Sequence, residues 1–128
     1  MNNQRPIAVP IAQSVTDFPF GEDQIRAAFA ENSQVWLCAK DICRTLNLTW
    51  SGATLQSVPK QWVTLLKSDT ESGAQETCFV NEAGCFKLIF RSNKPEAISI
   101  ANRVSVDVLS PMRRRWKAWA RNHSQGLH

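Results

Sequence analysis

The sequence has no apolar run of eighteen residues, no close pair of cysteines and no glycine-rich phosphate loop. A membrane-spanning helix needs such a run, so none is expected. The first 15 residues also lack the continuous apolar segment of a signal peptide, and we therefore expect an intracellular protein. A length of 128 residues is enough for one domain with one hydrophobic core.

Histidine is almost absent, because His123 and His128 both lie in the C-terminal tail. Catalytic pairs of the Ser-His or Cys-His type are therefore not expected, and we predict neither an enzyme nor a catalytic residue. The cysteine spacing does not match a zinc finger or ribbon, so it favours reduced, buried thiols over a metal site. No cofactor is expected. The four cysteines are Cys38, Cys43, Cys78 and Cys85.

Acidic residues are scarce at the C-terminal end. Residues 1–102 carry nine Lys/Arg and ten Asp/Glu, whereas residues 103–128 carry six Lys/Arg and only Asp107. The net charges of the two parts are therefore −1 and +5. This asymmetry favours an anionic partner, and DNA is the default choice for an intracellular chain.

Apolar periodicity predicts the fold class. Alternation at 18–20 and 25–29 indicates strands, and three more strands are expected at 34–38, 62–66 and 75–80. With helices in the second half, we expect one small α+β domain, in which an antiparallel sheet or hairpins precede a helical C-terminal half. The expected divisions are a flexible arm (1–16), the folded domain (17–110) and a basic amphipathic helix with tail (111–128). A polar loop is expected at 68–74.

Helical spacing predicts a pair of short helices at 40–46 and 50–58. In the first of these, Lys40, Asp41, Arg44 and Thr45 are expected to face solvent.

Asn81 is expected to cap the next helix, whose apolar stripe would be Phe86, Ile89 and Phe90. Pro95 is expected to open a further helix ending at Leu109. A final helix would then begin at Ser110-Pro111 and end near residue 122.

The final helix is the main candidate for binding. One face carries an apolar set suited to a protein interface: Met112, Trp116 and Trp119. Another face carries Arg114, Lys117 and Arg121, with Arg113 beside them. These cations and Arg115 are expected to contact phosphates. Arginines in a first turn oppose the helix dipole, which a bound anion would explain. The alternatives are docking of the tryptophans on the domain or on a second copy, as in a homodimer, and contact with an anionic membrane surface.

Two other segments are weaker candidates. The helix pair within 39–58 resembles a helix-turn-helix and offers Ser51, Thr54, Gln56 and Ser57 to a DNA groove. Its turn lacks the usual glycine, so ordinary packing is the favoured explanation. The turn containing Arg91 and Lys94 precedes a helix and suits an anion, or is a solvated connector.

Two sequence blocks resemble the BRO family N-terminal domain of phage antirepressors and large DNA virus proteins. The first is Val35-Trp-Leu-Cys-Ala-Lys-Asp-Ile-Cys-Arg-Thr-Leu46. The second runs from Phe79 to Ala97, with Asn-Glu-x-Gly followed by Arg-Ser-x-Lys-Pro-Glu-Ala. A third block departs from the family pattern, because Ile100 and Arg103 stand where the family has aromatics.

The resemblance implies a phage or prophage regulator in the bacterial cytoplasm, with DNA-binding capacity and control over lysis and lysogeny. Antirepressors of this family act on a phage repressor by protein contact, so a repressor is a second expected partner. The alternative is a protein-interaction module that sequesters a phage repressor or host factor without binding DNA. No membrane partner is implied.

Overall fold

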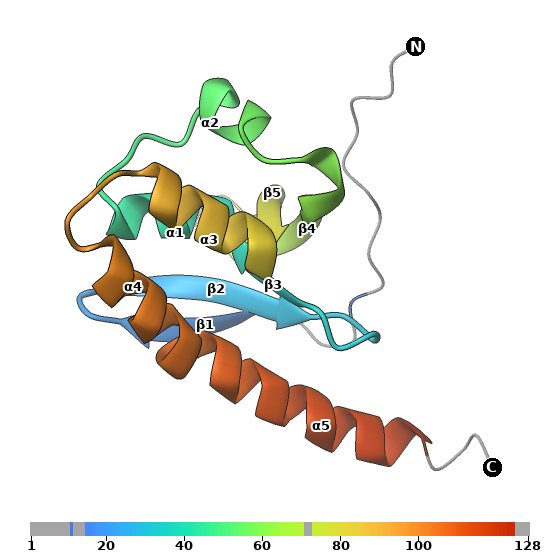
Figure 1. Cartoon of the computed structure of the whole chain (residues 1–128). Coiled ribbons are helices and arrows are strands. Elements are labelled where there is room, and N and C mark those ends of the chain that lie inside the picture. Colours follow the sequence, from blue (N-terminus) through green and yellow to red (C-terminus); the bar gives the residue numbers. More distant parts are fainter. Residues whose placement is uncertain (1–10, 12–14, 71–72, 125–128) are drawn as a thin grey trace.

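The computed structural model describes residue 11, residues 15–70 and residues 73–124. Most of the predicted arm, residues 1–16, lies outside the described residues. Within the described part, five antiparallel strands and a group of helices form an α+β domain, which confirms the predicted fold class (Figure 1).

The five strands form one sheet in the order β1-β2-β3-β5-β4. Each neighbouring pair is antiparallel, and β2 and β3 lie at its centre with β5. The sequence therefore predicted all five strands, the first two from apolar alternation. The strands are β1 (Thr16–Phe20), β2 (Asp23–Phe29), β3 (Val35–Cys38), β4 (Val63–Thr70) and β5 (Gly73–Asn81).

The two faces of the sheet bury different clusters. Ile25 and Phe29 of β2 lie in the main core together with apolar side chains of the helices. Trp36 of β3 points to the opposite face and packs in a smaller cluster with Phe79 of β5. Successive strand residues alternate between the two faces of the sheet, which explains the two clusters. The helices cover the face that carries the main core.

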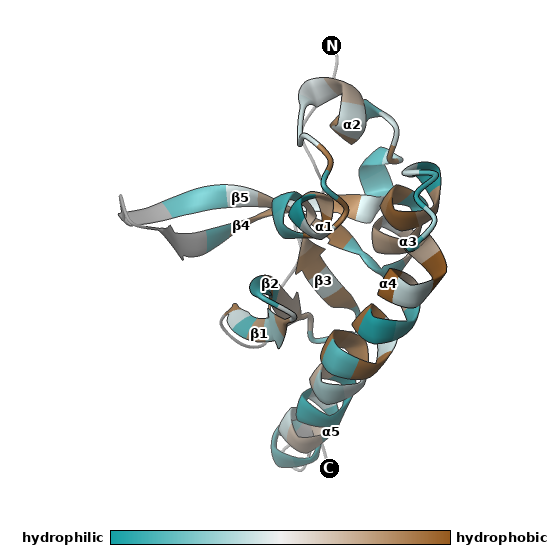
Figure 2. Ribbon diagram, turned by 90° about the vertical axis from the view of Figure 1, so that its left-hand side faces the viewer, coloured by the Kyte–Doolittle hydropathy of each residue, from teal (hydrophilic) through white to brown (hydrophobic). Residues whose placement is uncertain are grey.

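The β4–β5 hairpin is longer than predicted. Residues 68–74 do not form a loop, because β4 continues to Thr70 and β5 begins at Gly73. The polar composition hid a strand pattern in which opposite charges face each other, as in the pair of Lys67 and Glu76. Figure 2 shows this hairpin projecting away from the helices.

The predicted pair of short helices is present as α1 (Ala39–Thr45) and α2 (Gly52–Gln56). After α1 the chain reverses at Asn47, whose φ of 58° is left-handed. The N–H of Leu48 then donates to the Cys43 carbonyl at 2.8 Å, a Schellman-type helix end. A 3₁₀ turn, Lys60–Trp62, leads into β4.

Helix α3 (Glu82–Arg91) begins as predicted. The side-chain oxygen of Asn81 accepts a hydrogen bond from the N–H of Gly84 at 2.9 Å. A Cβ atom on Gly84 would lie 2.9 Å from the Cβ of Val80, so glycine permits the close approach of α3 to the end of β5.

The apolar stripe of α3 differs in part from the prediction. Ile89 is buried as expected, but Phe90 is 52% exposed and Leu88 is buried in its place. The prediction for Phe90 is wrong because α3 packs on the sheet through Cys85, Leu88 and Ile89, which leaves Phe90 on the solvent side.

The C-terminal helices form one continuous helical stretch from α4 (Ala97–Val104) through a π-helical segment (Ser105–Leu109) to α5 (Ser110–Ser124). Two boundaries therefore differ from the prediction, because Pro95 lies in the turn before α4 and no break precedes Pro111. A proline ring crowds the carbonyl four residues earlier, and the wider π turn accommodates it. There the Ser110 hydroxyl donates to the Ser105 carbonyl at 3.0 Å.

Candidate nucleic-acid interface

Helix α5 carries a stripe of exposed cations. Arg114, Lys117 and Arg121 are all exposed, and their spacing of i, i+3 and i+7 places them on one helix face. Within the part of the chain that the structure describes, none of the three forms an ion pair. We call these residues the α5 stripe. No acidic residue follows Asp107 in the sequence, so the stripe has no neighbouring negative charge on its own helix.

The other two predicted phosphate ligands have partners within the domain. Arg113 forms a salt bridge with Glu82 at the start of α3. The guanidinium carbon of Arg115 lies 5.1 Å from the ring centroid of Phe18, and its Nη1 donates to the Thr16 hydroxyl at 3.4 Å. Of the five cations expected to act together, the three of the α5 stripe therefore have no ion pair among the described residues, and the other two contact the domain.

The apolar face of α5 docks on the domain itself. Met112 has no exposed surface and is part of the main core, so it is a structural residue and not an accessible anchor for a partner. Trp119 packs edge-on against Phe29 with ring centroids 6.2 Å apart. The indole N–H of Trp116 donates to the Glu31 carbonyl at 3.0 Å. This is the docking alternative that the sequence left open.

The expected conflict between arginines and the helix dipole does not arise. Ser110 is not a free helix end, because the helical stretch begins at Ala97 and the Ser110 N–H is bonded to the Ser105 carbonyl. The positive end of the dipole lies in the first turn of a helix, far from Arg113. The dipole is therefore no argument for an anion at this place.

Sequence reasoning missed one further cation. The guanidinium carbon of Arg103 lies 4.1 Å from the ring centroid of Phe20 in β1. Arg103 and Arg115 thus place guanidinium groups over Phe20 and Phe18, two residues apart on the same face of one strand. The alternation of the two phenylalanines was visible in the sequence, but their cationic partners lie more than 80 residues away.

The two weaker candidates meet in the folded chain. Arg91 and Ser92 at the end of α3 line a pocket together with Thr49 and Thr54, which flank the start of α2. Lys94 is half-buried in the same turn and does not line the pocket. Figure 1 shows α2 and α5 at opposite ends of the domain, so this pocket and the α5 stripe are separate surfaces.

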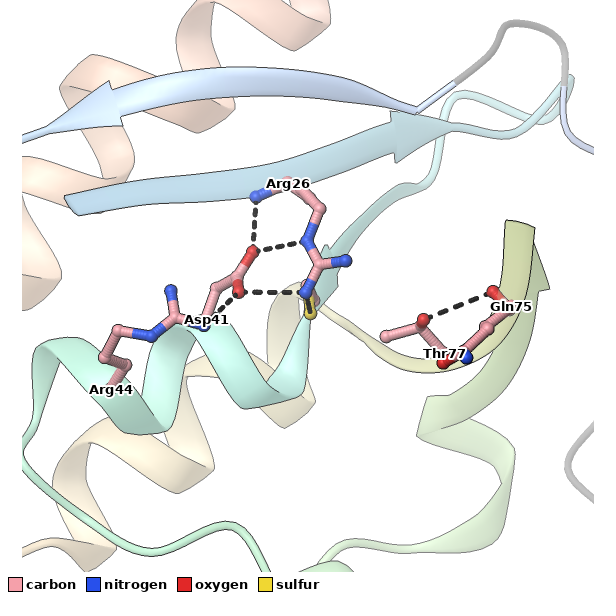
Figure 3. A network of polar contacts seen from close by, with 6 residues as sticks. Arg26, Asp41, Arg44, Gln75 and Thr77 are labelled. Carbon is pink, nitrogen blue, oxygen red and sulfur yellow. Dashed lines mark hydrogen bonds and ion pairs between the residues drawn. The ribbon is translucent and has the colours of Figure 1, made fainter. Parts of the chain in front are cut away.

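Asp41 is buried and not exposed as predicted. It is 2% exposed and lies between α1 and β2, where Arg26 of β2 pairs with it (Figure 3). Burial alone would raise the pKa of Asp41, but hydrogen bonds from the side chain and backbone of Arg26 outweigh burial and hold the pKa below its usual value. Arg44 adds a contact at 3.2 Å. This network fixes α1 against the sheet.

The environment of the cysteines disfavours their thiolate form. Burial raises the pKa of Cys43 and of Cys78 to about 11, and it also raises the pKa of Cys38 and Cys85. Among the described residues, no group of three His, Cys, Asp or Glu side chains is placed to hold a metal ion. Likewise, no helix in the described ranges combines the length and apolar character needed to cross a membrane.

Comparison with known proteins identifies one domain. The family model described as "BRO family, N-terminal domain" matches residues 24–110. An uncharacterised protein from Haemophilus influenzae is 35% identical over 101 residues, which is 78% of this chain and 50% of that protein. The chain therefore spans about half the length of this relative. No solved structure matches the chain.

Proposed function

Because the chain belongs to the BRO family and carries its N-terminal domain, we propose that it is a regulator of phage or prophage gene expression that binds duplex DNA through the α5 stripe. The observation that carries the proposal is that Arg114, Lys117 and Arg121 are exposed on one face without an acidic partner in the described residues. Such a stripe suits phosphate contacts, which position a protein on DNA independently of base sequence. The proposed molecule is a binding protein and not an enzyme.

The test measures binding of the purified chain to a random fluorescent duplex at several salt concentrations between ~50 and ~200 mM. Affinity should fall steeply as salt rises, because each phosphate contact releases counterions. The double variant Arg114→Gln/Lys117→Gln should lower the slope of log K against log salt by about 2, roughly one for each contact. It should weaken binding to all duplex sequences alike.

Lys40→Gln/Lys67→Gln is the matched control. It removes the same charge from exposed positions on α1 and β4. If the control reduces the slope as much as the α5 variant does, net charge and not the stripe determines binding. Absence of duplex binding by the wild-type chain even at ~50 mM salt would refute DNA binding.

The regulatory step that we propose takes place in the bacterial cytoplasm and acts on a phage repressor, in the manner of antirepressors of this family. The two activities separate in one experiment, in which the chain is added to a repressor–operator complex. Release of repressor by the Arg114→Gln/Lys117→Gln variant as well as by the wild-type chain would assign that step to protein contact. Release by the wild-type chain alone would assign it to DNA binding.

A second candidate function is protein interaction without DNA. Met112 is buried and the domain partly covers Trp116 and Trp119, so little of the predicted apolar face of α5 is left for a partner. Among the described residues, the large apolar side chains that are exposed lie elsewhere, and this candidate would draw its contacts from them: Leu65, Phe90, Ile98 and Val106. Phe90→Ser and Ile98→Ser should then abolish capture of the repressor and leave duplex binding unchanged.

A further inference from the structure

The pocket between α2 and the end of α3 is formed by two chain segments that approach each other. Its volume is about 150 Å³. One wall comes from the α1–α2 connection, where Asn47 turns the chain, and the other from the last turn of α3. The lining residues are Leu48, Thr49, Thr54, Leu88, Arg91 and Ser92.

Both walls lack acidic residues. Residues 42–68 and residues 83–95 contain no aspartate or glutamate. Arg91 is the cation among the lining residues of the pocket, and Lys87 and Lys94 lie near it in the same segment. The lining of the pocket therefore carries the positive charge of Arg91 with no acidic side chain among its own residues. The local potential therefore favours an anion.

Two polar side chains in the pocket have donors to offer. In the described part of the chain, neither the Arg91 guanidinium nor the Thr49 hydroxyl has a hydrogen-bond partner or ion pair in the fold. The other hydroxyls already donate within the domain: that of Thr54 to the Thr49 carbonyl at 3.2 Å, and that of Ser92 to the Ile89 carbonyl. A guanidinium and a hydroxyl beside the apolar side chains of Leu48 and Leu88 form a small site for an oxyanion.

We propose that this pocket binds a backbone phosphate of the nucleic acid, held by Arg91 and Thr49. The inference rests on the proposed function and adds a second contact surface, at the other end of the domain from the α5 stripe. A phosphodiester suits the site because one guanidinium neutralises its single charge and the hydroxyl donates to its second free oxygen.

The test uses Arg91→Gln with Lys87→Gln as its control. Lys87 is exposed one helical turn earlier on α3 and does not line the pocket. Arg91→Gln should weaken duplex binding about tenfold at ~0.1 M salt and lower the salt slope by about 1, whereas Lys87→Gln should have a much smaller effect. Circular dichroism confirms that each variant is folded.

Thr49 is tested by Thr49→Val, which removes the hydroxyl and keeps the shape. If both side chains hold one phosphate, the double variant Thr49→Val/Arg91→Gln should weaken binding by less than the product of the two single effects. Thr49→Ser should retain wild-type affinity. If the double variant weakens binding by the full product of the two single effects, the two side chains do not hold the same phosphate and the shared site is overturned.

NMR titration of the ¹⁵N-labelled chain distinguishes a backbone phosphate of a duplex from a free phosphate compound as the ligand of the pocket. Duplex should shift the Arg91 Nε–Hε resonance at micromolar concentration, and inorganic phosphate or a mononucleotide should do so only at millimolar concentration.

If the mononucleotide acts at micromolar concentration and Arg91→Gln leaves duplex binding unchanged, the pocket is a small-molecule site and the inference is overturned. If duplex binding depends on the α5 stripe but Arg91→Gln and Lys87→Gln reduce duplex affinity equally, the inference fails and the proposed function stands. No duplex binding by the wild-type chain overturns both.

Discussion

The carboxylate of Asp41 accepts three hydrogen bonds from Arg26, one from its backbone N–H and two from its guanidinium group. The two residues lie 15 positions apart and join α1 to β2. The Arg26 Nη2 also contacts the sulfur of Cys38 at 3.1 Å (Figure 3). A buried carboxylate is stable only with such partners, so the pair fixes where α1 begins.

Asp41→Asn should destabilise the domain by roughly 3 kcal/mol, because it removes the negative charge that accepts three hydrogen bonds from the largely buried Arg26. Urea unfolding followed by circular dichroism measures this loss. Arg44→Gln is the control, since Arg44 is 47% exposed and contacts the same carboxylate from the solvent side. Its effect should remain below about 1 kcal/mol. Equal losses in the two variants would contradict the assignment of the main interaction to Arg26.

The stability of the domain should also depend on Asp41 at low pH. The pKa of Asp41 is lower in the folded chain than in the unfolded chain, so the unfolded state takes up the proton first as pH falls. The stabilisation is therefore complete above the unfolded value of about 4 and is lost progressively below it. The difference in urea midpoint between wild type and Asp41→Asn should narrow from pH 6 to pH 3. A constant difference over this range would argue against the shifted pKa.

Arg103→Met should lower the melting temperature by about 2–4 °C, through loss of a cation–π contact of about 0.5–1 kcal/mol with Phe20. Methionine keeps most of the aliphatic length and removes the charge. Differential scanning calorimetry is the measurement. Asn102→Ala, at an exposed neighbouring position, should leave the melting temperature within one degree of wild type.

Trp119→Ala should destabilise the domain by roughly 3 kcal/mol, because its ring packs on Phe29 in the core. The double variant Trp116→Ala/Trp119→Ala should lose still more and unfold at lower urea concentration. If the tryptophans instead served a partner alone, the isolated domain would keep its stability. Lys117→Gln, on the exposed face of the same helix, is the control and should be nearly neutral.

The thiols should react slowly with 5,5′-dithiobis(2-nitrobenzoic acid) in the folded chain. Cys78 is half-buried, and burial raises its pKa to about 11. At pH 8 the thiolate is then about 0.1% of the total, compared with roughly a quarter for an ordinary cysteine. All four thiols should react rapidly in urea. Fast labelling of Cys78 in the native chain would contradict the raised pKa.

Local patterns predicted much of this fold. Alternation predicted the first two strands, and the Asn81 cap followed from one residue and its neighbours, because these signals depend on contacts within a few positions. Asp41 was misplaced for the opposite reason. Asp41 is paired with Arg26 of β2, and the helical spacing of residues in α1 does not reveal a partner in a distant strand.

The candidate site was predicted in outline. Helical periodicity correctly grouped Arg114, Lys117 and Arg121 on one face, but it could not separate them from Arg113, whose partner Glu82 lies 31 residues away. The pocket at Arg91 joins segments some forty residues apart, so its two halves were visible in the sequence only as separate polar turns.

The shape of the β4–β5 hairpin implies uneven protection of its backbone amides from hydrogen exchange. Only Phe79, Val80 and Asn81 of β5 pair with β3, whereas the rest of the hairpin is held in the sheet by β4–β5 pairing alone. A two-stranded ribbon is marginally stable by itself, so its outer amides open without unfolding of the domain. The amides around Ile25 and Leu37, in the central strands, exchange only when the whole domain unfolds. Deuterium uptake should therefore advance along the hairpin from its tip toward Phe79.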